Sequence, residues 1–420
     1  MARSGSVVWL CALALLCFGA VMVSSAGMSI DAVPIEAPED AAGPGWKSAH
    51  PPTLRDLLQS RPVIHLGFAM IALTIAAFMP VARALGPARD VWVKRPVALL
   101  GLCVAGMLAV LAVVYLPGIG RSVNGSARWV NLPVVGSAQP SELVKWTLPI
   151  ALAFYVIAIG DRIRSLWTGL APGAVALALV AGFVGVEDLG TAVLVGAVGG
   201  LVLLAGGARL WHFLPLIPAA LGALYVAVAG SPYRIRRLET FIDPFADPAG
   251  DGYHIIQSMS SIAGGGPFGR GLGHGLQKFG YLPEDTTDFL FAVVCEELGF
   301  SGAALLLAIF VLLGWSLVGI VRRTTEPVAA LVALGVAATL LAQAAMNLLV
   351  VTGLGPTKGI ALPLVSAGGT GWVLTSAALG LVIAIDRLPS RAPEPETEPE
   401  TEPETEPAET PEDEPLWSMA

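Results

Sequence analysis

The sequence predicts an all-α, polytopic membrane protein with about ten transmembrane helices. Of its 420 residues, 55% are hydrophobic and only 13% are charged, and the mean hydropathy is +0.72. A soluble globular domain is rarely so apolar. Uncharged runs of about 17 residues or more also recur along the chain, and each is long enough to cross a hydrocarbon core of about 30 Å as a helix.

The expected spans are apolar stretches separated by short polar loops. An even number of spans puts both termini on the same side of the membrane. Basic residues in short loops mark the cytoplasmic side. Lys94 and Arg95 follow the second expected span, and Arg322 and Arg323 follow the eighth. Both termini are therefore expected in the cytoplasm, and the long segment 230–296 outside it. The ten spans are 7–26, 63–82, 96–116, 143–160, 168–186, 191–208, 211–229, 297–320, 327–351 and 369–385.

The last 29 residues differ in composition from the membrane domain at 1–391. Residues 392–420 carry eleven acids and no base, so the rest of the chain has a net charge of +3 against −8 for the whole. Repeats rich in Pro, Glu and Thr cannot bury apolar surface, which predicts a disordered acidic cytoplasmic tail. A solvated spacer is the expected role, and Leu416 and Trp417 near the tip leave a docking element as the alternative.

Three carboxylates precede the eighth expected span, in GYLPEDTTDF at 280–289: Glu284, Asp285 and Asp288. A charged side chain at the bilayer centre costs about 2.5–3.5 kcal/mol on insertion scales, so ionisable groups at the mouth of a span usually face a polar cavity. Asp288 is the leading candidate for such a group. The alternative is that Asp288 caps the helix that follows, because Asp suits a helix N-terminus. The residues alone leave both roles open.

More polar residues lie on the same expected side of the membrane, in the loop that leads into the fourth span. This loop contains GSARWVNL at 125–132 and GSAQPSELVK at 136–145. Glu142 and Lys145 are three residues apart and share one helix face. They form either a local ion pair or a site at which the lysine meets an anionic lipid head group.

Two glycine-rich segments also attract attention. GGGPFG at 264–269 matches G-x-G-x-x-G, but no strand precedes it and no P-loop lysine follows, so a nucleotide site is not indicated. A loop that turns tightly and approaches other backbone closely is the better interpretation. The loop 353–371, between the last two spans, carries Lys358 and Ser366.

Together these segments resemble the SEDS family, the FtsW/RodA/SpoVE proteins of bacterial cell-wall synthesis, over nearly all of residues 7–387. Order and spacing match as well. QKFGYLPE and DPFADPAGDGY look more like FtsW or SpoVE than RodA. The matching pieces are MVSSAGM (22–28), GSARWVNL, QPSELVK, EDLGT (187–191), FIDPFADPAGDGYHIIQS (241–258), GGGPFGRGLG (264–273), QKFGYLPEDTTDFLFAVVCEELG (277–299) and the 353–371 loop.

The resemblance helps to decide whether the first apolar span is retained, and the sequence differs from the family pattern at three places. Arg3, the apolar run and Ser24-Ser25-Ala26 would also suit a cleaved signal peptide. Because MVSSAGM aligns with sequence that the family retains, we expect a membrane anchor. The departures from the family pattern are Thr286 in place of a His, Ala367 in place of an aromatic residue, and Val186-Glu187 in place of Gln-Pro.

The resemblance implies a peptidoglycan glycosyltransferase that polymerises lipid II into glycan strands and releases undecaprenyl diphosphate, in cell division or cell-shape maintenance. The family's catalytic carboxylate maps to Asp288. It would take the proton of the acceptor hydroxyl, or hold a divalent cation, Mg²⁺ or Mn²⁺, beside the leaving diphosphate. The expected substrate-binding residues are Arg128, Trp129, Glu142, Lys145, Gln257, Lys278, Glu284, Lys358 and Ser366.

Partners and location follow from the same resemblance. We expect lipid II and the nascent glycan strand, a class B penicillin-binding transpeptidase, and other divisome or elongasome proteins, but no nucleic acid. The location is the bacterial cytoplasmic (inner) membrane, with the division septum as one site. A lipid II flippase is the first alternative. It would need a polar pathway across the bilayer, whereas most of these spans are apolar and the charged residues gather at one face of the membrane. A non-catalytic division scaffold is the second alternative and would not need Asp288.

The expected topology can be tested with reporter fusions after Arg95, Gly252 and Arg391. We expect cytoplasmic signals at 95 and 391 and a periplasmic signal at 252, because the short-loop basic residues orient the chain. Periplasmic activity at 391, or a cytoplasmic signal at 252, would rule out the ten-span arrangement.

Overall fold

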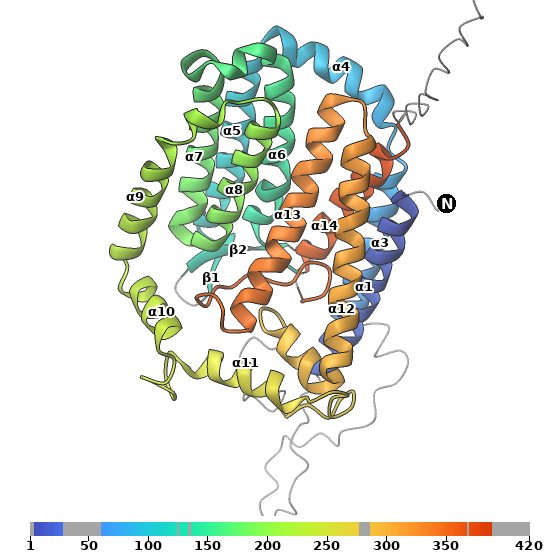
Figure 1. The fold of residues 1–420 in the computed structure, drawn as a ribbon, viewed down its shortest axis with the longest axis vertical. Coiled ribbons are helices and arrows are strands. Elements are labelled where there is room, and N and C mark those ends of the chain that lie inside the picture. The colour runs from blue at the N-terminus through green and yellow to red at the C-terminus, as the bar shows by residue number, and fades with distance from the viewer. Residues whose placement is uncertain are drawn as a thin grey trace, which may run out of the picture.

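Helices make up nearly all the secondary structure of the chain, which the computed structural model describes for residues 4–27, 60–123, 126–132, 136–276, 286–367 and 369–388. Helices α5 to α8 form one side of a bundle, and α1, α3, α12, α13 and α14 form the other (Figure 1). Helix α14 packs along α3, and α1 packs along α12. The expected acidic tail lies outside the described residues.

Each expected apolar stretch corresponds to one helix of the bundle or its edge. Among the described residues, seven helices are long and apolar enough to cross a membrane, or eight if the bent pair α3 and α4 forms one span; α8 and α14 are apolar but shorter. The chain is thus an all-α polytopic membrane protein, while the exact number of ten spans stays a prediction. The helices are α1 Ser4–Ala26, α3 Arg61–Ala77, α5 Pro96–Ala112, α6 Pro140–Ile159, α7 Ala171–Glu187, α8 Leu189–Ala205, α9 Leu216–Ala229, α12 Leu290–Arg323, α13 Pro327–Val351 and α14 Thr370–Ile385.

Several shorter helices were not expected from the apolar pattern. Helix α4, Val81–Lys94, follows α3 at a bend of 72°. It is amphipathic: Trp92 stacks on Phe154 with ring centroids 5.8 Å apart, whereas Arg83 and Arg89 are exposed. Figure 1 shows α9, α10 and α11 running along the edge and base of the bundle. The remaining elements are α10 Pro232–Ile242, α11 Tyr253–Gly264, 3₁₀ turns at Val113–Tyr115, Gly160–Arg164 and Leu210–His212, and a π-helical turn at Leu166–Leu170.

A small antiparallel sheet occupies the segment that the sequence analysis treated as a loop. Its strands are β1 Gly120–Val123, β2 Ser126–Leu132 and β3 Gly136–Ala138, in the order β1-β2-β3. Arg121 of β1 lies opposite Trp129 of β2, and β3 leads directly into α6, which begins at Pro140 after the N-cap residue Gln139. The sheet therefore fixes β2 beside the start of α6.

Helix α12 begins earlier than the predicted eighth span. It starts at Leu290, seven residues before 297, and Gly299 interrupts it with φ 67°. The glycine-rich loop packs on this break: the amide of Gly271 donates to the carbonyl of Glu297 at 2.9 Å. A Cβ on Gly269 would lie 2.1 Å from that same carbonyl oxygen, so only glycine fits. This confirms that the 264–269 glycines serve a tight turn and a close backbone approach.

Helix α1 also closely approaches the loop between α13 and α14. A Cβ on Gly19 would lie 2.5 Å from the carbonyl oxygen of Val365 and 2.8 Å from that of Leu364. Both atoms belong to backbone, which cannot turn aside as a side chain can. Gly19 thus sets how closely this loop is held against the bundle.

We expect Gly19→Ala to lower the thermal unfolding temperature of the detergent-purified protein, because the new methyl group must displace residues 364–365. Gly101→Ala in α5 is the matched control, since its Cβ meets no atom within 4 Å. Removing a glycine from a helix interior gains about 0.5–1 kcal/mol, so the control should melt at the same temperature or slightly higher. Equal behaviour of the two variants would contradict this packing argument.

Candidate functional site

A large polar cavity lies among the sheet, α6, α8, α10, α13, the segment before α12 and the loop between α13 and α14. Its volume is about 820 Å³. The lining is unusual for an apolar bundle because it holds five cationic and four acidic side chains. These are Arg121, Arg128, Lys145, Arg237 and Lys358, and Glu142, Asp188, Asp251 and Asp288.

The cavity brings together most of the residues expected from the sequence. Its lining includes Asp288, Arg128, Trp129, Glu142, Lys145, Lys358 and Ser366. Gln257 does not line it and lies on the half-buried face of α11. Lys278 and Glu284 fall outside the described residues. Segments of the chain more than 200 residues apart therefore meet at one place, although this proximity alone assigns no role.

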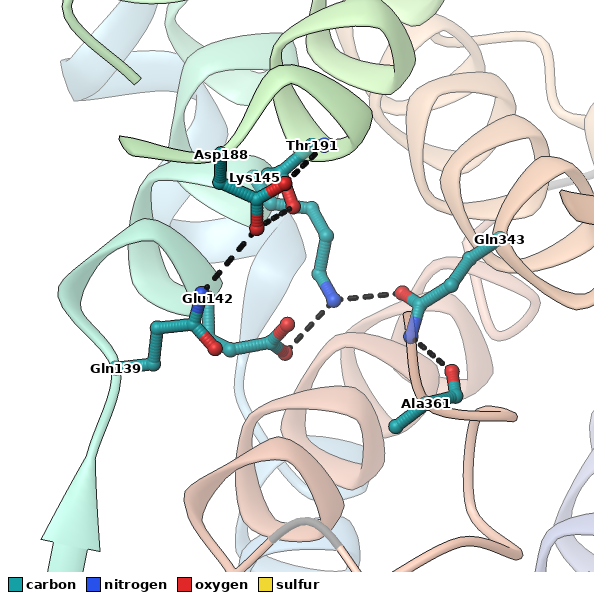
Figure 2. A network of polar contacts seen from close by, with 7 residues as sticks. All are labelled: Gln139, Glu142, Lys145, Asp188, Thr191, Gln343 and Ala361. Carbon is teal, nitrogen blue, oxygen red and sulfur yellow. Dashed lines mark hydrogen bonds and ion pairs between the residues drawn. The ribbon is translucent and has the colours of Figure 1, made fainter. Parts of the chain in front are cut away.

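Lys145 is the most buried of the cavity's cations, with 2% of its side chain exposed. Its ammonium donates to Glu142 Oε2 at 2.7 Å and to Gln343 Oε1 at 2.6 Å (Figure 2). The amide of Gln343 in turn donates to the carbonyl of Ala361 at 2.8 Å. A lone charge in this position would be strongly destabilising. The network satisfies the charge and connects α6, α13 and the loop after α13.

Asp188 stands at the N-cap of α8. Its carboxylate accepts the amide of Thr191 at 3.0 Å and the hydroxyl of the same residue at 2.8 Å, and Gln139 Nε2 lies 3.5 Å away (Figure 2). A carboxylate at a helix N-terminus satisfies orphan N–H groups and suits the macrodipole. Asp188 is thus a capping residue that also places negative charge in the cavity wall.

Lys358 lies in the loop between α13 and α14. Its ammonium makes no hydrogen bond or ion pair with another residue among those described, and its stem lies against Gly190, whose Cβ would be 3.1 Å from Lys358 Cδ. Burial lowers the pKa of this ammonium, and the negative charge of Asp188 partly offsets the effect. An unpaired, half-buried ammonium is well suited to receive an anionic group.

Asp288 lies immediately before the N-cap of α12. The N-cap position itself belongs to Phe289, one residue later. A Cβ on Gly359 would lie 3.0 Å from Asp288 Oδ2, and the main-chain carbonyl of Asp288 accepts a hydrogen bond from Asn347 Nδ2 at 2.7 Å. The carboxylate therefore sits against the loop that also carries Lys358.

The sequence analysis missed several residues of the site. Gln343 and Asn347, one turn apart on the otherwise apolar α13, carried a usable signal, because polar side chains inside a span usually face a functional interior. Arg121 and Arg237 carried none, since exposed loop arginines are common. Arg237 stacks over Tyr233 at 4.6 Å and donates to the carbonyl of Thr357 at 2.8 Å.

These features define a polytopic membrane protein whose apolar helices enclose a charged cavity at one end. The chain belongs to the FtsW/RodA/SpoVE family of cell cycle proteins, whose sequence model matches residues 60–390.

Individual relatives are similar over most of their length. The chain is 38% identical over 281 residues to a protein of Geobacter metallireducens named "Probable peptidoglycan glycosyltransferase FtsW", covering 67% of this chain and 75% of that one. A protein of Aliivibrio salmonicida with the same name is 35% identical over 326 residues, covering 77% and 78%.

Two solved structures share the fold. One is a chain of a peptidoglycan synthase complex studied for the structural coordination of polymerization and crosslinking, with TM-score 0.65, 27% identity and coverage of 90% of this chain and 96% of that one. The other is the rod shape determining protein RodA of Thermus thermophilus, with TM-score 0.58, 25% identity and coverage of 90% and 95%. The FtsW-like resemblance seen in the sequence is confirmed.

We expect Lys145→Met to destabilise the protein by about 3–5 kcal/mol, because removing one partner of a buried ion pair leaves the other charge uncompensated. Adding Glu142→Gln to Lys145→Met should recover part of the loss. Thermal unfolding in detergent measures both. Thr147→Val on the same helix is the control, since among the described residues its hydroxyl bonds only to carbonyls of its own helix, at 3.1 and 3.4 Å. If Lys145→Met melts like this control, the network does not stabilise the bundle.

Proposed function

We propose that this chain is a peptidoglycan glycosyltransferase that polymerises lipid II into glycan strands and releases undecaprenyl diphosphate. The observation that carries the proposal is the mixed-charge cavity, which Asp288 lines together with Arg128, Lys145 and Lys358. Family membership and the names of the relatives support the same reaction class.

The reaction needs a group that accepts a proton. The hydroxyl of the acceptor sugar loses its proton as the new glycosidic bond forms, and a carboxylate within hydrogen-bond reach can take it. In this proposal Asp288 is that base. The glycosidic oxygen of the donor leaves with its diphosphate, so negative charge remains on the leaving group and must be stabilised.

The cations of the cavity suit that leaving group. Lys358 has no ion pair among the described residues, and Arg128 Nε is buried without a hydrogen-bond partner in the described part of the chain. Buried donors normally have acceptors, and phosphate oxygens would supply them. Lys145 has used two of its three donors on Glu142 and Gln343, so one remains. Trp129 offers an aromatic face beside Arg128.

A divalent cation at this site would have few ligands from the protein. No group of three or more potential metal-ligating side chains occurs among the described residues. In this proposal Asp288 would be a protein ligand, and diphosphate oxygens and water would complete the shell, as is usual for Mg²⁺. Such an ion would neutralise the leaving diphosphate.

The setting of the reaction is also a proposal. We place the cavity on the outer face of the cytoplasmic membrane, with both termini in the cytoplasm, and the division septum as a site of action. A related chain is found in a peptidoglycan synthase complex. We propose that this chain likewise works with a class B penicillin-binding transpeptidase that crosslinks the strands it makes.

We expect Asp288→Asn to insert normally and bind lipid II but to make at least 100-fold less glycan, because a general base typically contributes 10²–10⁴-fold. The measurement is polymerisation of purified lipid II by the full chain, with translocation scored separately. A flippase without polymerase activity would make no glycan in either form.

Asp247→Asn is the matched control. Asp247 is exposed in the loop between α10 and α11 and accepts the amides of Gly250 and Asp251 at 3.1 and 3.2 Å, a turn that Asn can partly maintain. It should retain near wild-type synthesis. Near wild-type synthesis by Asp288→Asn would instead refute the catalytic assignment.

A further inference from the structure

Two carboxamides on one face of α13 hold the main chain around the cavity. Gln343 and Asn347 are 5% and 2% exposed in a helix that is otherwise strongly apolar. Their amide nitrogens do not bond within the helix. Gln343 donates to the carbonyl of Ala361, and Asn347 donates to those of Ile360 and Asp288, both at 2.7 Å.

We propose that Asn347 is a positioning residue for the Asp288 carboxylate, an inference that rests on the proposed function. Its amide joins two segments that are not neighbours in the chain, the one before α12 and the loop after α13. The carbonyls of Asp288 and Ile360 therefore both accept a hydrogen bond from the same atom, Asn347 Nδ2. Gly359, next to Ile360, lies against the Asp288 carboxylate itself, so the same clamp sets the distance between carboxylate and loop.

Asn347 itself is not part of the cavity lining. It cannot act by contacting substrate there and must act through the backbone of Asp288. Both of its partners are carbonyl oxygens, which fixes the orientation of the amide, since only nitrogen can donate.

The carbonyl end of Asn347 carries a cost. Its Oδ1 is buried without a hydrogen-bond partner among the described residues. Burying an unpaired polar atom is unfavourable. Simple packing of α13 would be served by a leucine of similar size without this penalty, so the two donated bonds are what the residue contributes.

Gln343 links Lys145 of α6 to the same loop. It accepts from the Lys145 ammonium and donates to Ala361, the residue after Ile360 (Figure 2). One face of α13 thus sets the relative positions of a buried cation and the proposed base through adjacent carbonyls of a single loop.

The test compares kcat and KM for lipid II polymerisation by purified full-length variants. Asn347→Leu removes both donors, and we expect kcat to fall 10- to 100-fold, because small displacements of a reacting group cost up to about 10². KM should change less than about threefold, since no lining residue is altered. Asn347→Ser keeps one donor and should lose less kcat than the leucine variant.

Thr339→Val is the matched control in the same helix. Thr339 is 1% exposed, and its hydroxyl donates only to the carbonyl of Gly335, one turn back, at 2.7 Å. This variant should keep wild-type kcat. An equal fall in kcat for Thr339→Val would show that general loosening of α13 explains the loss, and would overturn the proposal.

Other outcomes are equally decisive. Unchanged kcat in folded Asn347→Leu overturns the positioning role, whether or not KM is raised. The glycosyltransferase assignment would still stand if the wild-type protein makes glycan and Asp288→Asn does not. If Asn347→Leu fails to insert, wild-type kcat in Asn347→Ser overturns it. Absence of glycan from the wild-type protein overturns the proposed function and this inference with it.

Discussion

The site depends on one constraint: a charge inside an apolar bundle must be paired or solvated. Lys145 meets it by lying between Glu142 of its own helix and Gln343, which ties the lysine to α13. Because desolvated charge is costly, the bonds that satisfy it are strongly specified. The helices α6 and α13 and the loop at Ala361 are consequently held in register by the same polar contacts that create the cavity.

Close backbone approaches complete the frame. Gly19 lets α1 touch the loop at 364–365, and Gly269 and Gly299 let the glycine-rich loop rest on the break in α12. Each of these glycines allows a contact between main-chain segments, and main chain cannot move aside as a side chain can. The apolar helices supply the bulk of the packing, while a few glycines and amides decide where the charged residues come to lie.

The sequence was a good guide to the helices and a partial guide to the site. Length and hydropathy located every apolar stretch that forms a helix, because spanning a hydrocarbon core leaves few alternatives. They did not reveal the sheet at 120–138 or helix α4, whose formation depends on contacts such as Trp92 with Phe154. Helix α12 began earlier than predicted because the glutamates before Gly299 read as loop residues, although the fold buries them.

The charged residues of the cavity could likewise be predicted only in part from the sequence. Asp288, Glu142 and Lys145 were found from position at the mouths of spans, whereas pairing between distant residues was invisible. A wall of cations alone would hold a diphosphate tightly, but here four acidic side chains stand among five basic ones. A site through which anions pass must bind well enough to admit them and weakly enough to let them leave. In the proposed reaction, the interspersed carboxylates would favour release of the spent lipid carrier, and product release commonly limits the rate of an enzyme.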